Sequence, residues 1–237
     1  MNRFLITGIL LFLYLGCMVK TNQSPWEGSG ILLMKKKILV DESEVLFSRE
    51  TFSREDLSLF NFHRSVWIIE NGWLEGKNPG NHPGMAILKQ EFKGNVLVEF
   101  EAQTINPSTH DINVMWNGEW IDSLDQRGIA YVAGLEGWWT GKVGIEKSPD
   151  YTFMLGTPLL DFKPGKIYKI QAGSIEGHCF ILADGKLLLE GMDPDPIDHQ
   201  RFTQVGFEAY SSHIRIKNVI IRRIKWEPVE MSYEPEF

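Results

Sequence analysis

Acidic, amide and histidine side chains gather in one short stretch, Thr109 to Trp120, which reads THDINVMWNGEW. His110 stands beside Asp111, a pairing that general acid–base catalysis uses. Asn113 follows on the same face of an alternating pattern, and Glu119 closes the stretch. A carboxylate, an amide and a histidine flanked by tryptophan could bind a sugar and act on it.

A second group of such residues lies near the end of the chain. In 205–210, Glu208 and Tyr210 share one face of a predicted strand whose other face is apolar, and His213 follows. If this strand lies beside the central stretch, Glu208 would face Asp111 across a groove. A solvated outer face is the alternative.

We therefore predict one site on a concave sheet, with the catalytic residues His110, Asp111 and Glu208. The predicted substrate-binding residues are Glu101, Asn113, Glu119, Arg127, Trp138, Trp139, Tyr210 and His213. The two tryptophans stand in a glycine-flanked loop, where an indole face could stack on a sugar ring. The alternatives are that Asp111 and Asn113 are solvated strand residues, that His110 caps a loop, and that one tryptophan belongs to the core.

A metal and a reactive thiol are the other chemistries considered. Asp193, Asp195 and Asp198 offer carboxylates of the kind that calcium takes, but two prolines explain this loop without a metal. We predict no cofactor, with calcium as the alternative. Cys179 lies in an apolar run and is predicted to be a small buried side chain.

The N-terminus has the features of an export signal. Arg3 precedes an apolar run that is too short for a comfortable membrane span, and Gly16-Cys17 follows it. We predict a signal peptide at 1–17, a linker at 18–30 and one domain at 31–237. There are two alternatives for the processing of this signal: it is a lipoprotein signal with a lipid on Cys17, or it is cleaved in the ordinary way nearby. The protein would then be periplasmic, on the cell surface or secreted.

The composition limits the partners. The formal net charge is −7, which argues against nucleic acid and anionic membrane surfaces. Membrane contact is expected only through a lipid anchor at Cys17. An oligosaccharide or polysaccharide is the expected partner.

Short alternating segments must position these residues. They follow one another closely from 44 to 224, Asn71-Gly72 predicts a hairpin, and Arg54 to Phe62 could hold a single helical turn. No stretch shows sustained helical periodicity. The pattern predicts an all-β, two-sheet antiparallel sandwich.

Two segments, LFSRETF…VWIIENGWLEG and VGFEAYSSHIRIKNVIIRRI, resemble bacterial concanavalin A-like jelly rolls of the lectin/glucanase superfamily. Among these, the similarity is greatest to exported 3-keto-disaccharide hydrolase-like domains and their relatives near polysaccharide-degradation genes. It covers roughly residues 44 to 225. The resemblance implies a concave sheet that binds carbohydrate.

The chain departs from the glucanases of this superfamily in one respect. Laminarinase-like members carry two glutamates around an aspartate on one strand, and neither Glu99-Phe100-Glu101 nor the stretch 70–75 supplies the aspartate. This departure weakens an ordinary glucanase interpretation. The hypotheses kept are an exported enzyme that cleaves glycosidic bonds, by glycoside or 3-keto-glycoside hydrolysis or elimination, and a non-catalytic, lectin-like glycan-binding module. A structural subunit of a surface complex is the third.

Overall fold

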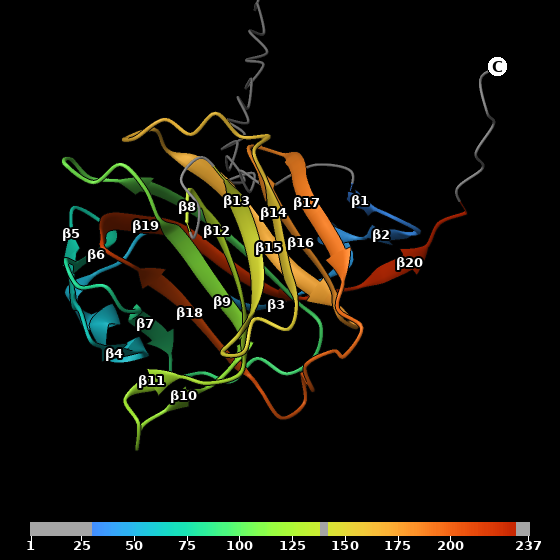
Figure 1. The fold of residues 1–237 in the computed structure, drawn as a ribbon, viewed down its shortest axis with the longest axis horizontal. Helices are drawn as coiled ribbons and strands as arrows, with labels where there is room; N and C mark the ends of the chain where they lie inside the picture. Colours follow the sequence, from blue (N-terminus) through green and yellow to red (C-terminus); the bar gives the residue numbers. More distant parts are fainter. Residues whose placement is uncertain (1–29, 138–141, 231–237) are drawn as a thin grey trace, which may run out of the picture.

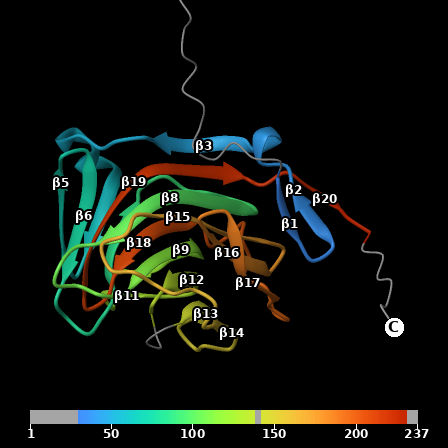
Figure 2. The same ribbon diagram turned by 90° about the horizontal axis from the view of Figure 1, so that it is seen from above.

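Two large antiparallel sheets packed face to face form the protein, in a computed structural model that describes residues 30–137 and 142–230 (Figures 1 and 2). In spatial order, the seven-stranded sheet contains β14 (Met154–Thr157), β13 (Val143–Ser148), β12 (Ala130–Leu135), β9 (Ile112–Gly118), β18 (Gln204–Ala209), β7 (Gly84–Leu88) and β4 (Phe60–His63). The eight-stranded sheet contains β17 (Lys186–Met192), β16 (His178–Ala183), β15 (Tyr168–Ile175), β8 (Val96–Thr104), β19 (Ser212–Arg223), β6 (Trp73–Asn78) and β5 (Val66–Glu70), with β3 (Glu44–Arg49) also paired to β19. The predicted all-β sandwich is confirmed.

The core lies between the two sheets and follows the alternation of the strands. On β9, Ile112, Val114 and Trp116 point into it, and all three are almost completely buried. The Trp116 indole also donates a hydrogen bond to Ser174 Oγ at 2.9 Å. Cys179 is fully buried in the same core, as predicted.

A small third sheet joins the two ends of the domain. It consists of β1 (Ile31–Leu33), β2 (Lys36–Ile38) and β20 (Trp226–Pro228), and the 3₁₀ turn η1 (Val40–Glu42) follows β2. Its apolar side chains pack on Leu97, Phe180 and Leu182 of the eight-stranded sheet. This sheet therefore covers part of that sheet's outer face.

Turn residues set the local connections. Asn71 and Gly72 both have positive φ, 50° and 80°, and they close the predicted hairpin between β5 and β6. The expected helical turn is the 3₁₀ segment η2 (Arg54–Leu59), which Ser53 caps. Within the described residues, no helix is long and apolar enough to cross a membrane.

The central stretch does not continue as a strand to Trp120, because β9 ends at Gly118 after Asn117 adopts a positive φ of 43°. The chain then forms a short hairpin of β10 (Trp120–Ile121) and β11 (Gln126–Arg127). Trp120 is buried and stacks on His63, with ring centroids 4.3 Å apart.

We call the side of the seven-stranded sheet that faces away from the core its open face. Apolar side chains from four segments cluster on this face, namely Met85, Ile87, Met115, Trp120, Ala130 and Val132. The same strands carry polar side chains farther along the face, and these build the site described next.

Candidate functional site

A pocket of about 330 Å³ lies on the open face of the seven-stranded sheet. Its lining residues come from several strands and loops and are Asn81, Asp111, Asn113, Arg127, Tyr151, Glu208 and Tyr210. Four of them belong to the two segments that sequence analysis singled out, because β9 and β18 are neighbours in the sheet. In this pairing Asn113 lies directly opposite Glu208.

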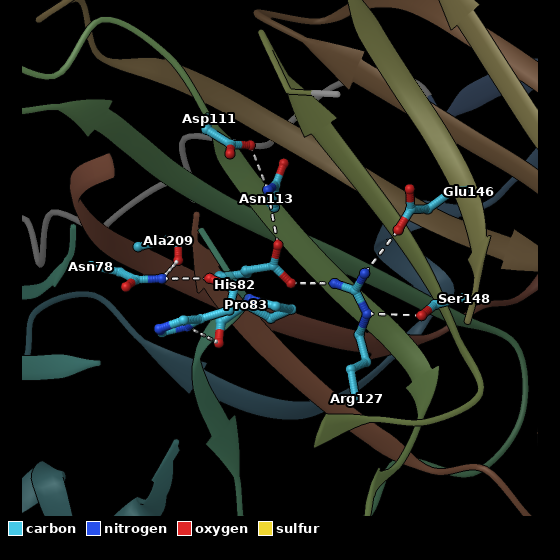
Figure 3. Close-up of polar contacts among 10 residues, drawn as sticks. Asn78, His82, Pro83, Asp111, Asn113, Arg127, Glu146, Ser148 and Ala209 are labelled. Atoms are coloured by element: carbon cyan, nitrogen blue, oxygen red, sulfur yellow. Dashed lines mark hydrogen bonds and ion pairs between the residues drawn. The ribbon is translucent and has the colours of Figure 1, made fainter. Parts of the chain in front are cut away.

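The Asn113 amide joins two carboxyl groups. Its Nδ2 donates to Asp111 Oδ1 at 2.6 Å and to Glu208 Oε1 at 3.2 Å (Figure 3). Since both acceptors are carboxyl oxygens, they fix which way the amide faces. Asp111 and Glu208 are therefore held on either side of a single amide, with Asp111 at a positive φ of 77° as the chain enters β9.

Arg127 links Glu208 to a third carboxyl group. Its Nη1 donates to Glu208 Oε2, its Nη2 donates to Glu146 Oε1 at 2.8 Å, and its Nε donates to Ser148 Oγ at 3.1 Å (Figure 3). The β10–β11 hairpin supplies Arg127, whereas Glu146 and Ser148 share one face of β13. The guanidinium is thus tied to β18 and β13, which β9 and β12 separate in the sheet.

The burial of these groups changes their acidity. Loss of hydration and the nearby charge of Glu208 raise the pKa of Asp111 to about 8. Burial also raises the pKa of Glu146 to about 8, although Arg127 opposes the shift. The pocket therefore holds a protonated Asp111 at neutral pH beside Glu208, which is ion-paired to Arg127. A group that can give a proton next to one that can take it suits acid–base chemistry.

One side-chain acceptor in the pocket has no partner. Asn113 Oδ1 is buried, and no described group donates a hydrogen bond to it. A glycine makes the space for this side chain: Gly134 on β12 lies opposite Asn113, and a Cβ there would stand 1.8 Å from Oδ1. A buried polar atom left open in a pocket can bind a ligand that donates a hydrogen bond.

The structure places His110 and His213 elsewhere. Both line a second pocket of about 420 Å³ at the end of the sandwich, together with residues of the 77–79 and 106–109 segments. His213 Nε2 lies 2.7 Å from Glu75 Oε1. Neither histidine lines the first pocket, because the chain turns at Asp111 and at Ser211 and leaves the open face at these points.

Two other predicted residues also lie outside the pocket. Glu101 is on β8 of the other sheet and points away from the core, where Lys217 Nζ lies 3.6 Å from its Oε2. Glu119 follows the end of β9, and its backbone pairs with Gly128 and Ile129 at the base of the hairpin. Trp138 and Trp139 lie outside the described residues.

The acidic loop is held by the protein itself. Asp193 Oδ2 accepts a hydrogen bond from Tyr131 at 2.8 Å and lies 3.1 Å from Lys147 Nζ, which also pairs with Asp195. Among the described residues, no group of three or more His, Cys, Asp or Glu side chains could hold a metal ion. The calcium alternative gains no support from this geometry.

Sequence analysis missed Asn81, Glu146, Ser148 and Tyr151. A partial signal for Glu146 is present, because residues 143–146 alternate between apolar and polar or glycine residues, but Lys147 breaks the alternation before Ser148. Tyr151 carries no comparable signal, since it lies in the turn after β13 with a positive φ of 55° and more than half of its surface exposed.

Comparison with solved structures assigns the fold. The carbohydrate-binding module CBM66 from Bacillus subtilis superposes with a TM-score of 0.53 at 12% identity, covering 69% of this chain and 95% of the module. A candidate glycosyl hydrolase from Parabacteroides distasonis gives 0.51 at 12% identity, covering 75% of this chain and all of the other. The potassium-bound carbohydrate recognition domain of Emp46p gives 0.51 at 11% identity, covering 75% and 95%.

These likenesses show the fold, a two-sheet antiparallel jelly roll of the concanavalin A-like type. At such low identity the similarity concerns the fold, and the role of the pocket must be argued from its own residues. No protein-family profile matches the sequence, and no curated protein matches it.

Proposed function

We propose that this protein is an exported enzyme that cleaves glycosidic bonds in the pocket on the open face. The observation that carries the proposal is the bridged pair of Asp111 and Glu208, one protonated and one paired with Arg127. Glycoside hydrolysis uses two carboxyl groups in these two states. The solved structures support a carbohydrate ligand, since all three descriptions concern carbohydrate binding or glycosyl hydrolysis.

In the proposed reaction, Asp111 gives its proton to the glycosidic oxygen as the bond from that oxygen to the anomeric carbon breaks. Glu208 attacks the anomeric carbon in the same step and forms a covalent glycosyl-enzyme, which a water molecule then hydrolyses while Asp111 takes the proton that the water loses. One amide nitrogen contacts both carboxyl groups, and this close spacing suits such a double displacement. Arg127 pairs with Glu208, and Asn113 holds both carboxyl groups in place. Tyr151 and Tyr210 line the pocket and offer aromatic surface to the sugar.

The alternative function is that of a lectin-like module that binds a glycan without cleaving it. The favouring observation is that two of the three superposed structures are carbohydrate-binding domains. A binding module needs no titratable pair, and turnover therefore separates the two functions.

The test compares the wild-type protein with Glu208→Gln on a panel of oligosaccharides that includes 3-keto-glycosides, with release of new sugar ends as the readout. The matched control is Glu99→Gln. Glu99 is also a buried glutamate held by an arginine and an amide, Arg222 at 2.7 Å and Gln171 at 3.0 Å, but it lies on the outer face of the other sheet.

We expect the wild type and Glu99→Gln to cleave at least one member of the panel. Glu208→Gln should lower kcat/KM by about a hundredfold or more, since it removes the attacking carboxylate. Binding of a glycan without cleavage would favour the lectin. Equal turnover by Glu208→Gln would exclude this pocket as the catalytic site.

A further inference from the structure

Among the described residues that line the first pocket, no side chain offers a free cation. Among its described lining residues, Arg127 is the one side chain with a fixed positive charge, and each of its three nitrogens already donates to a protein oxygen. Two of those oxygens belong to carboxyl groups. A guanidinium binds a sugar carboxylate or sulfate through its N–H donors, and those of Arg127 already donate to protein oxygens.

The same pocket is rich in carboxyl groups. Asp111 and Glu208 line it, and Glu146 stands behind Arg127. Three carboxyl groups therefore surround one guanidinium in a region where most of these side chains are under a tenth exposed. An incoming anion would lose its hydration here and find the one guanidinium already paired with Glu208.

One acceptor among the described residues that line the pocket, Asn113 Oδ1, lacks a hydrogen-bond donor. Asn113 Oδ1 is buried and unpartnered among the described residues, while Asn113 itself is 3% exposed. A sugar hydroxyl can donate to this oxygen. Neutral and acidic sugars both carry hydroxyls, so the lack of a free cation among the described lining residues is the observation that separates the two classes.

We propose, on the basis of the function proposed above, that the sugar unit held in this pocket is uncharged and donates a hydroxyl to Asn113. Uronic acids and sulfated sugars are then excluded from it. Neutral hexose or pentose oligosaccharides are the substrate class.

The test measures binding and cleavage at pH 6 for matched pairs of probes. Gluco-, galacto-, manno- and xylo-oligosaccharides serve as the neutral set, and oligogalacturonate, oligoglucuronate and sulfated galacto-oligosaccharides as the acidic set. We expect Kd or kcat/KM to favour the neutral set by at least tenfold. If an acidic probe is bound or cleaved as well as the neutral probes or better, this inference is overturned and the proposed function stays intact. If no probe of either set is bound or cleaved, the proposed function is overturned as well.

One variant tests whether the preference for neutral probes comes from charge rather than from the shape of the pocket. Glu208→Gln, tested by Kd for both probe sets, removes the carboxylate partner of Arg127 and keeps the size of the side chain. It should narrow the preference for neutral over acidic probes several-fold, and added salt should narrow the preference of the wild type. A variant that weakens both sets equally, with no effect of salt on the ratio, contradicts the electrostatic account.

Discussion

Two buried glutamates among the described residues are held in nearly the same way, and Glu208 is the one that lines the pocket on the open face. Glu99 is bound by Arg222 and Gln171, and Glu208 is bound by Arg127 and Asn113. An arginine–glutamate–amide cluster can therefore be purely structural here. Around Glu208, the difference is a second carboxyl group on the same amide and a buried amide oxygen, Asn113 Oδ1, with no partner among the described residues.

The acidity of Asp111 gives a prediction for the pH dependence of activity. The acid must carry its proton to act, and its pKa is raised to about 8 by burial and by the charge of Glu208. We expect kcat/KM to hold below pH 7 and to fall as the pH rises through about 8. A profile measured from pH 5 to 10 tests this, and activity that still increases up to pH 10 contradicts the assignment of Asp111 as the acid.

At the scale of elements, the site depends on three neighbouring strands and one hairpin. β9 and β18 bring Asn113 opposite Glu208, β12 leaves space at Gly134, and the β10–β11 hairpin returns Arg127 to the sheet. The pocket is therefore a property of sheet order and register, which places its side chains within hydrogen-bonding reach.

Gly134 provides the prediction at this scale. In Gly134→Ala the new Cβ would stand 1.8 Å from Asn113 Oδ1, a distance that forces the amide to move. Because this amide holds both carboxyl groups, we expect kcat/KM to fall at least about tenfold while circular dichroism stays that of a β protein. Unchanged kinetics in the folded variant would show that the position of Asn113 does not matter.

The sequence predicts the strands better than their partners. The alternation around Ile112 and around Phe207 indicates which side chains enter the core, because that signal is local. The pairing of Asn113 with Glu208 joins residues 95 positions apart, and no local pattern specifies it. His110 was assigned to the groove because it precedes Asp111, but the positive φ of Asp111 turns the chain away there. Glu146 carries only a partial signal, because Lys147 interrupts the alternation of β13.

At the scale of the whole molecule, the buried acids affect stability. Asp111 and Glu146 have folded-state pKa values of about 8, above the ordinary values of 3.8 and 4.5. Between those limits the folded protein keeps protons that the unfolded chain releases, and stability is lost as the pH rises. Each group should lower the free energy of unfolding by up to about 1.4 kcal/mol for every pH unit by which the pH rises in this window.

Denaturant unfolding measured at pH 5, 6, 7 and 8 checks this expectation. The free energy of unfolding should decrease toward pH 8, and the decrease should be smaller in Asp111→Asn and in Glu146→Gln. A free energy of unfolding that rises over this range in the wild type, or the same decrease in both variants, would contradict the shifted pKa values.

Export is the second prediction for the whole molecule. The positive Arg3, the apolar run after it and Gly16-Cys17 predict removal of a signal before about residue 25. Mass spectrometry of the protein from its native cells should show a lipidated Cys17 or a new N-terminus nearby. A cytoplasmic protein that retains Met1 would rule out the export signal.

The most direct test of the central claim compares two leaving groups in Asp111→Asn. An oligosaccharide leaving group needs a proton from the acid, whereas a dinitrophenolate leaves without one. For the sugar whose oligosaccharide the wild type cleaves, we predict that Asp111→Asn lowers kcat/KM on the oligosaccharide by about 10²- to 10⁴-fold. On the matching dinitrophenyl glycoside kcat/KM should fall by less than about tenfold. Equal losses on both substrates, or no loss on either, would contradict the assignment of Asp111 as the acid that cleaves a glycosidic bond in this pocket.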